Sequence, residues 1–317
     1  MEKQGLLGGY LDLSDEDARF GQPSFEQAES ELQHLALNAA LAKAKLSPSD
    51  IDVVLSGDLI NQCTSSTYGL SSFGIPFLGI YGACSTMAQG LLIASLLVGS
   101  LYTRRAAAVT SSHFCSAERQ FRSPLEYGAQ RTPTSQHTVT GAGAFLLGAD
   151  AEELSRQPYI SQVLIGKIVD YGINDAANMG AAMAPAAIDT LSRYFAESGK
   201  EPSSFDLIAT GDLGSEGEYF VRTLLADEGI ELGKNYSDCG CLIYDLKNQD
   251  VNAGGSGCGC SAVTAAGYVM ECFRIGAYRD VLLIGTGALM SPLAIAQGMA
   301  IPAIAHLVRI SAWDAEI

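Results

Sequence analysis

The chain of 317 residues contains an internal repeat, and this repeat constrains the fold more than any other feature of the sequence. Residues 48–59 read PSDIDVVLSGDL and residues 202–213 read PSSFDLIATGDL, so six of the twelve positions are identical at an offset of 202 − 48 = 154. Each copy is an apolar strand pattern that ends in Gly-Asp-Leu. Each is preceded in the chain by a helical pattern, at roughly Phe25–Leu46 in the first half and Ala182–Ser198 in the second. The repeat predicts two similar halves, residues 1–152 and 153–317.

A second pair of similar segments, each rich in small residues, marks the start of a helix in each half. Residues 82–86 (GACST) open one apolar helix, and residues 258–262 (CGCSA) open the other. Cys84 and Cys260 are 260 − 84 = 176 positions apart, so the second half carries about 22 additional residues, which we expect at Glu231–Asn252. Helices that alternate with buried strands are typical of a layered α/β fold.

The helix that follows Cys84 lacks a charged face. Residues 59–103, 45 in all, contain no Asp, Glu, Lys or Arg. A helix that is apolar on all sides is buried in a core, and the polar residues that interrupt this stretch do not fit a transmembrane span. We therefore expect this helix to be packed between two sheets.

Composition excludes several classes of protein. Thirty-five acids and 19 bases give a net charge of −16, which argues against nucleic acid and anionic lipid as partners. The N-terminal 30 residues contain no long apolar run, so no export signal is expected, and the eight cysteines are expected to be reduced. The pairs Cys239/Cys241 and Cys258/Cys260 are spaced more closely than zinc ligands, so no metal or other cofactor is expected.

Cys84 is the leading candidate for a functional residue. It lies at a strand-to-helix junction, where the helix dipole would lower the pKa of a thiol and activate it. The alternative is a small buried apolar side chain. Ser85 would add a hydroxyl beside the free N–H groups of the helix start. The loop at Gly255 and Ser256 is either a comparable anion cradle or a tight turn.

Further candidates are polar or charged. His113 directly follows a strand, at the edge where α/β sheets bind ligands, although a structural role is an alternative. Arg119 and Arg122 would clamp a carboxylate or pair with acids nearby. Asp58 ends its strand as its repeat counterpart does, which indicates a shared structural role, whereas Asn61 is present only in the first copy and favours function there.

Only the second half begins with a sequence pattern typical of a strand. The second half opens with a strand pattern at residues 159–170 (YISQVLIGKIVD), but only Met1–Gln4 precede Gly5 in the first. We expect this strand to be central in its sheet, so that its loss would leave buried backbone groups unpaired. The sequence therefore suggests that Met1 is an internal methionine with about 25 residues ahead of it, including a strand.

Long motifs along the chain resemble the stage V sporulation protein AD family, a branch of the thiolase superfamily. They are GDLINQ (57–62), IPFLGIYGACSTMAQG (75–90), AERQFRSPLEYG (117–128), MGAAMAPAAIDT (179–190), DCGCLIYD (238–245) and AGGSGCGCSA (253–262). The resemblance extends over nearly the whole chain from Gly5 onward. It implies a thiolase-like duplicated α/β fold, layered αβαβα, with two mixed five-stranded sheets and buried central helices.

The resemblance also implies a function in spore formation. Members of the family bind dipicolinic acid (pyridine-2,6-dicarboxylate), usually with calcium, and take part in its uptake into the developing spore. They are peripheral proteins of the inner spore membrane in the forespore, beside membrane-embedded proteins of the same operon. The superfamily also implies a homodimer that pairs through the sheet of the first half.

The chain departs from the superfamily's enzymes in two loops. Condensing enzymes pair the cysteine with a His in the loop matching residues 253–262, and with a second Cys or His after residues 281–287; neither is present here. Cys84 is then a vestigial nucleophile position in a pocket that binds ligand, with His113, Arg119 and Arg122 as the implied source of positive charge. The alternatives are a Cys84-dependent condensing enzyme or acyltransferase acting on thioesters, or a structural scaffold for membrane partners.

Overall fold

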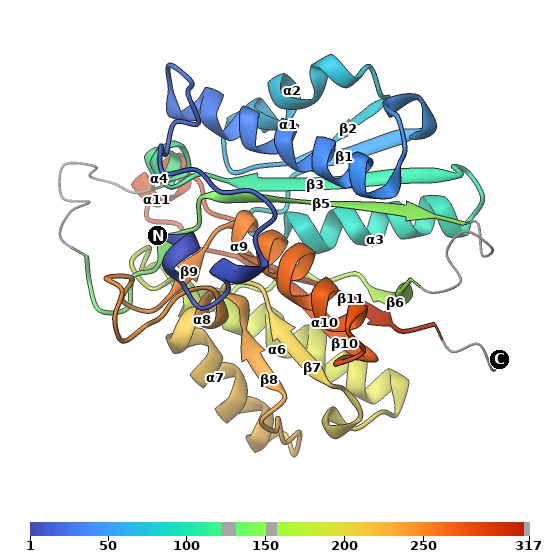
Figure 1. Ribbon diagram of the computed structural model, residues 1–317. Coiled ribbons are helices and arrows are strands. Elements are labelled where there is room, and N and C mark those ends of the chain that lie inside the picture. Colours follow the sequence, from blue (N-terminus) through green and yellow to red (C-terminus); the bar gives the residue numbers. More distant parts are fainter. Residues whose placement is uncertain (122–130, 150–156, 314–317) are drawn as a thin grey trace.

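The computed structural model describes residues 1–121, 131–149 and 157–313, and it contains two mixed sheets with helices between and outside them (Figure 1). The first sheet has the order β2 (Phe77–Gly79), β1 (Val53–Gly57), β3 (Arg105–Ser112), β5 (Gly141–Gly148). The second has the order β6 (Tyr159–Leu164), β11 (Ala303–Ser311), β10 (Asp280–Ala288), β7 (Leu207–Thr210), β8 (Tyr236–Asp238). Two short strands, β4 (His137–Thr138) and β9 (Gly255–Ser256), pair in parallel across the two halves.

The two sheets repeat one pattern of strand directions. β1 is parallel to β2 and β3, while β5 is antiparallel to β3. Likewise β7 is parallel to β8 and β10, while β11 is antiparallel to β10. Val53 faces Ala106 just as Leu207 faces Val281, so the registers of the two sheets also correspond.

The helices form three layers around these sheets (Figure 1). The outer face of the first sheet is covered by α1 (Phe25–Ala44) and α2 (Thr64–Leu70), and that of the second by α6 (Met179–Ser198) and α7 (Gly214–Asp227). Between the sheets lie α3 (Thr86–Gly99) and a continuous helix made of α9 (Cys258–Val263), a π-helical segment (Thr264–Val269) and α10 (Met270–Arg274). Three short helices complete the described part: α4 (Phe114–Phe121), α8 (Cys239–Ile243) and α11 (Pro292–Ala296).

Local sequence signals explain where the long helices begin and end. The Ser24 side chain accepts a hydrogen bond from the Gln27 N–H at the start of α1, and Asn178 caps α6 in the same way. Gly199, with a φ of 64°, ends α6 in the left-handed conformation. α3 contacts β3 on one side and β10 and β11 on the other, which explains why its sequence has no charged face.

The layered αβαβα arrangement with buried central helices is as predicted, but two details of the prediction are wrong. The first sheet has four strands among the described residues rather than five. Of the described strands only β11 pairs with β6, so β6 is an edge strand rather than a central one. The offset between the halves rises from 154 to 236 − 77 = 159 at β8, the counterpart of β2, and to 281 − 106 = 175 at β10. Most additional residues therefore follow β8, where most of the expected insertion Glu231–Asn252 also lies.

Candidate functional site

The turn before α3 holds Cys84 between the two sheets. Ala83 has a φ of 50°, which a residue with a side chain rarely adopts. The hydroxyls of the turn close it: Ser85 Oγ donates to the Gly82 carbonyl at 2.6 Å, and Thr86 Oγ1 donates to the Ala83 carbonyl at 2.6 Å. The Ser85 hydroxyl, predicted to face a ligand, is therefore engaged within the turn.

A glycine of β10 allows this turn to lie directly on the second sheet. A Cβ atom at Gly287 would be 2.4 Å from the Gly82 oxygen and 3.0 Å from the Ser85 nitrogen. Both contacts are with backbone atoms, so a larger residue would push the turn away from the sheet. The position of Cys84 is thus set by a strand that lies about 200 residues later in the chain.

The Cys84 thiol lies near a carboxylate. Cys84 is 6% exposed, and Asp212 is close enough for its charge to act on the thiol. Burial, and then the negative charge of Asp212, raise the pKa of Cys84 well above its ordinary value of 9.0. The Gly257 backbone N–H donates both to Asp212, at 2.8 Å, and to the sulfur. The thiol, and not the thiolate, is therefore the form at neutral pH, which is the opposite of the activation that the helix dipole alone predicts.

Asp212 connects three segments of the second half. It follows β7, and its carboxylate accepts hydrogen bonds from Gly257 N at 2.8 Å and Ser256 Oγ at 3.2 Å in the glycine loop. It also accepts one from Thr286 Oγ1 in β10 at 2.9 Å. Burial raises the pKa of Asp212 to about 6, so the carboxylate is predominantly charged at pH 7.

A second thiol, that of Cys258, lies beside Cys84. Its Sγ donates to the Ser111 carbonyl at 2.9 Å. It is buried in one apolar cluster with Leu59, Cys84 and Ala117. Burial, followed by the carboxyls of Glu29, Asp58 and Asp212, raises the pKa of Cys258 well above its ordinary value.

A buried acidic network lies on the first-half side of these thiols. The Glu29 carboxyl accepts hydrogen bonds from Ser111 Oγ at 3.0 Å and Ser116 Oγ at 2.6 Å. Burial, and then the charge of Asp58, raise the pKa of Glu29 to about 8. Asp58 accepts from both the N–H and the hydroxyl of Ser66, at 2.8 and 2.6 Å, so its predicted structural role is consistent with its contacts.

Tyr81 and a strained loop lie at the exposed side of the site. Tyr81 is 52% exposed, and the partial burial of its hydroxyl, together with the thiols of Cys84 and Cys258, raises its pKa to about 12. The neighbouring residues Gln62 and Cys63 both have positive φ, at 65° and 53°. Backbone strain of this kind is concentrated at functional sites, so it supports this region as the site.

The structure brings some of the predicted residues together. Ser256 donates a hydrogen bond to Asp212, and Cys84 lies close enough to affect the pKa of Asp212. Ser85 follows Cys84 in the chain, and Gly255 precedes Ser256 in β9. Asp58 lies close enough to Cys258 to influence its thiol. Asn61, also predicted, is exposed at the start of the strained loop.

The predicted positive groups are engaged elsewhere. His113 is 1% exposed; its Nε2–H donates to the Ala18 carbonyl at 2.8 Å, and its Nδ1 accepts from Cys115 N at 3.1 Å. Burial lowers the pKa of His113, so it is neutral. Arg119 pairs with Glu26 at 3.0 Å. Arg122 lies outside the described residues.

Sequence analysis missed the central role of Asp212. The repeat Gly-Asp-Leu marked Asp212 and Asp58 equally, and nothing in the sequence indicated that only Asp212 contacts Cys84. Gly257 and Tyr81 were also missed, although Tyr81 is only three residues before Cys84.

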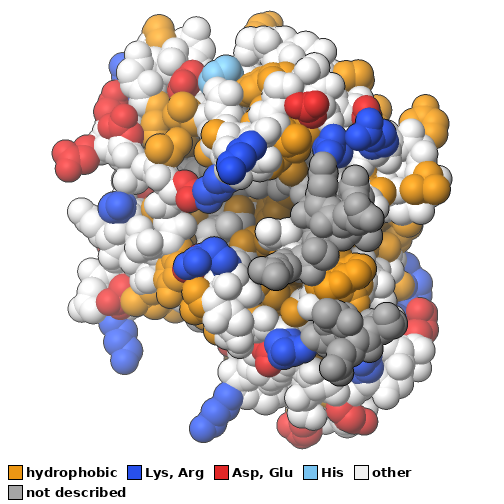
Figure 2. Space-filling view, turned by 45° about the vertical axis from the view of Figure 1, so that its right-hand side comes forward, with side chains coloured by type: hydrophobic (Ala, Val, Ile, Leu, Met, Phe, Trp, Pro, Cys, Tyr) orange, Lys and Arg blue, Asp and Glu red, His pale blue; other side chains and the backbone are white. Residues whose placement is uncertain are grey.

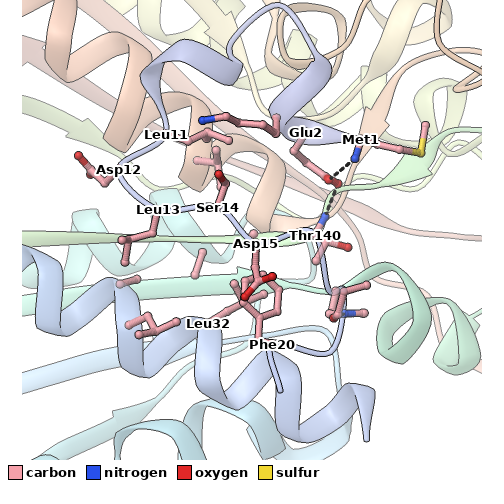
Figure 3. Close-up of a pocket in the computed structure, with 18 of the residues that line it drawn as sticks. Met1, Glu2, Leu11, Asp12, Leu13, Ser14, Asp15, Phe20, Leu32 and Thr140 are labelled. Atoms are coloured by element: carbon pink, nitrogen blue, oxygen red, sulfur yellow. Dashed lines mark hydrogen bonds and ion pairs between the residues drawn. The ribbon is translucent and has the colours of Figure 1, made fainter. Parts of the chain in front are cut away.

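A cavity lies away from Cys84, between α1, the start of β5 and the N-terminal segment (Figure 3). Its volume is about 470 Å³, and His113 is part of its wall. In residues 1–121, 131–149 and 157–313, no group of three His, Cys, Asp or Glu side chains is placed to hold a metal ion.

Two surface properties complete the description. None of the helices in the described part of the chain is both long and apolar enough to cross a membrane. On the face shown in Figure 2, Lys and Arg side chains are scattered among acidic and apolar ones and do not gather into one basic patch.

Comparison with solved structures identifies the fold. The chain is similar to 3-oxoacyl-[acyl-carrier-protein] synthase III from Aquifex aeolicus, with a TM-score of 0.56 at 13% identity over 96% of this chain and 93% of that one. It is also similar to OleA from Xanthomonas campestris, with a TM-score of 0.57 at 13% identity over 89% and 80% of the two chains. The fold is therefore thiolase-like, as predicted, and similarity at this identity concerns the fold alone.

Sequence comparison identifies the family. The chain is 43% identical over 305 residues to stage V sporulation protein AD of Bacillus subtilis, which covers 96% of this chain and 89% of the relative. The family model described as stage V sporulation protein AD (SpoVAD) matches residues 1–311. Taken with the duplicated fold and the Cys84 turn, these matches establish that the chain belongs to the stage V sporulation protein AD family.

Proposed function

We propose that this chain binds dipicolinic acid at the Cys84 site without catalysing a reaction, and that it takes part in the uptake of this ligand into the developing spore. The observation that carries the proposal is the buried carboxylate of Asp212, which lies near the Cys84 thiol and raises its pKa. In this family member a carboxylate occupies the neighbourhood of the thiol, where a condensing enzyme needs a base or an imidazole donor. The site therefore keeps the thiol and lacks a means of activating it.

The charges of the site favour the calcium chelate of dipicolinate over the free dianion. Asp212 is predominantly charged at pH 7 and Asp58 lies nearby, whereas Glu29, with a pKa of about 8, is predominantly protonated. A free dianion would be repelled by Asp212. One calcium ion cancels the two negative charges of dipicolinate, whose own carboxylates supply the oxygen ligands that calcium prefers.

The flat, aromatic shape of the ligand suits the ring of Tyr81 beside Cys84. Dipicolinate is flat and aromatic, and the half-exposed ring of Tyr81 lies beside the two thiols. Because His113 and Arg119 are engaged by Ala18 and Glu26, the proposal does not depend on their charges.

Calorimetric titration tests this proposal. Wild-type protein, Cys84→Ala, Tyr81→Ala and Arg119→Ala would be titrated with dipicolinate in the presence of calcium and, separately, with a chelator of calcium. We expect binding to require calcium, to weaken about tenfold or more in Cys84→Ala and Tyr81→Ala, and to be unchanged in Arg119→Ala, because loss of about 1.4 kcal/mol is tenfold in affinity. Absence of binding in the wild type would refute the function, and a loss confined to Arg119→Ala would refute this location.

The second candidate function is a condensing enzyme or acyltransferase that uses Cys84 on thioesters. It is favoured by one observation, the similarity of the fold to 3-oxoacyl-[acyl-carrier-protein] synthase III. Incubation with acyl-CoA followed by mass spectrometry of the Cys84 peptide separates the two functions. Acylation of Cys84 with turnover would replace the binding proposal.

We also propose that the protein acts as a homodimer, peripheral to the inner spore membrane of the forespore, beside membrane-embedded proteins of the same operon. The edge strand β2 supports the dimer, since Phe77 and Leu78 are 39% and 47% exposed and β2 pairs only with β1 among the described strands. A net charge of −16 argues against attachment through anionic lipid and favours attachment through protein partners.

A further inference from the structure

The core of the first half contains a polar pair that the second half replaces by apolar residues. Glu29 and Gln33 of α1 are both 0% exposed. The repeat aligns α1 with α6 at an offset of 179 − 25 = 154, so their counterparts are Met183 and Ala187, which belong to the apolar core of the second half. The same fold is thus built without polar groups at these positions. Because a buried carboxyl costs free energy, its presence in the first half points to a role other than stability.

Hydrogen bonds connect Glu29 to three other elements. Gln33 Oε1 accepts from Ser56 Oγ of β1 at 2.7 Å, and Gln33 Nε2 donates to Ser111 Oγ of β3 at 2.8 Å. Ser111 Oγ donates to Glu29 Oε1 at 3.0 Å, and Ser116 Oγ of α4 lies 2.6 Å from Glu29 Oε2. The Glu29 carboxyl therefore joins this chain of hydrogen bonds to α4.

The contacts of Ser116 accommodate a proton on Glu29. The Ser116 hydroxyl also lies 3.2 Å from the His113 carbonyl, which gives it a second acceptor. A protonated Glu29 can donate from Oε2 to Ser116 Oγ while Ser116 donates to His113, whereas a charged Glu29 accepts from Ser116. Burial, and then the charge of Asp58, raise the pKa of Glu29 to about 8, so the proton is predominantly retained at pH 7.

The elements around Glu29 bring acids and thiols toward it. Asp58 follows β1, and Glu26 of α1 pairs with Arg119 of α4 at 3.0 Å. The charge of Glu29 acts on the Cys258 thiol of α9, and β5 (GAGAFLLG) has no titratable side chain. Loss of the proton from Glu29 therefore adds a negative charge near that of Asp58. The other titratable side chains on or beside these elements are Arg19 before α1, Cys63 and Tyr68 at α2, His113 after β3, and Cys115 and Glu118 of α4.

α4 forms part of the cover of the two thiols. Its Ala117 is 0% exposed and belongs to the same buried apolar cluster as Cys84 and Cys258. Cys258 also contacts the network directly, since its Sγ donates to the Ser111 carbonyl at 2.9 Å. α4 has eight residues and begins just after β3 ends (Figure 1). A short helix at the end of a sheet can open locally while the long helices of the core stay folded.

We infer that protonation of Glu29 controls the opening of α4 over Cys84 and Cys258. With the proton bound, Glu29 is neutral and connects α4 to α1 and β3. When the proton is lost, a buried carboxylate lies near Asp58, and opening of α4 lets water reach it. The two thiols are therefore more accessible above neutral pH than below it. This control does not depend on the proposed function, because it acts whether or not a ligand binds.

Hydrogen exchange of the α4 peptide (residues 114–121) at pH 5.5 and 7.5 tests the inference. An opening that exposes Glu29 becomes about tenfold more favourable per pH unit between the ordinary pKa of 4.5 and the raised pKa of about 8. After correction for the intrinsic pH dependence of exchange, protection of α4 should fall about 50-fold in the wild type and change less than threefold in Glu29→Gln. Equal pH dependence in these two proteins would overturn the inference.

Two controls accompany the exchange measurement. Glu31→Gln removes a carboxyl from α1 outside the network, and it should keep the pH dependence of the wild type. The peptide of α6, whose position equivalent to Glu29 is Met183, should keep its protection at both pH values. A parallel loss of protection in α6 would indicate unfolding of the whole chain and would refute a local opening of α4.

Alkylation of Cys84 by iodoacetamide at pH 7.5 tests the cover itself. Glu29→Gln should label at least tenfold more slowly than the wild type, because α4 stays closed. Removal of a negative charge would by itself favour the thiolate and speed labelling, so the two effects have opposite signs. Glu29→Met, which copies the residue of the second half, should label as slowly as Glu29→Gln, while the partly exposed Cys63 keeps its rate in both. Labelling of Cys84 in Glu29→Gln at the wild-type rate or faster would refute α4 as the cover.

Discussion

Substitution of Asp212 by Asn tests whether this carboxylate keeps Cys84 protonated. Asn has nearly the same shape; its Oδ1 can still accept from Gly257 N, and its amide can donate to the Thr286 hydroxyl, but it carries no charge. Asp212 is the largest influence after burial on the raised pKa of Cys84. The variant should therefore shift the thiol toward the thiolate, which is the nucleophilic form.

The size of the effect follows from the separation of the two groups. At the distance of a hydrogen bond to sulfur, about 4 Å, and with an effective dielectric constant of about 20, a thiolate and a carboxylate repel by about 4 kcal/mol. Because about 1.4 kcal/mol corresponds to a tenfold change in the thiolate population, we expect at least a tenfold increase in the rate of alkylation. Burial of Cys84 persists in the variant, which is why we expect less than the full Coulomb value.

The assay is timed alkylation with iodoacetamide at pH 7.5, read by mass spectrometry of the Cys84 peptide. The partly exposed Cys63 and Cys115 report on reagent concentration and folding within the same molecule. Asp58→Asn is the matched control, because Asp58 is the repeat counterpart and is not among the main influences on Cys84. An unchanged rate at Cys84 in a folded Asp212→Asn protein would refute the reasoning.

Three other outcomes are expected. The pKa of Glu29 is raised from its ordinary 4.5 to about 8, so the folded chain holds a proton that the unfolded chain releases, and this contribution to stability is full below about pH 4.5 and lost as pH rises to about 8. In urea unfolding, the stability of Glu29→Gln relative to wild type should therefore increase by about 2–3 kcal/mol between pH 5.5 and pH 7.5, whereas a parallel loss in both proteins would contradict it. Gly287→Ala should lower the free energy of unfolding by about 1–3 kcal/mol and abolish calcium dipicolinate binding, because the new Cβ would lie 2.4 Å from the Gly82 oxygen. Gly99→Ala is the control and should have neither effect, because no atom lies within 4 Å of a Cβ at that position. Sedimentation should give a dimer for wild type and a species near 33.3 kDa for Leu78→Lys, and a wild-type monomer would show the β2 interface to be wrong.

The sequence by itself determined the features that depend on local pattern. The repeat at residues 48–59 and 202–213 predicted the duplication, and the uncharged stretch around α3 predicted a helix between two sheets. The GACST segment correctly placed Cys84 at a helix start. Such features are readable because periodicity and burial of one element are recorded in neighbouring residues.

The tertiary structure decided which distant groups meet. Asp58 and Asp212 are equivalent in sequence, yet only Asp212 reaches Cys84, because Gly287 allows the Cys84 turn to lie against the second sheet where Asp212 is anchored. His113 and Arg119 were expected in the pocket, but Ala18 and Glu26, each more than 90 residues away in the chain, engage them instead. The edge position of β6 likewise follows from the order of strands in a sheet, which is set by long-range pairing and packing and leaves no local pattern in the residues of the strand.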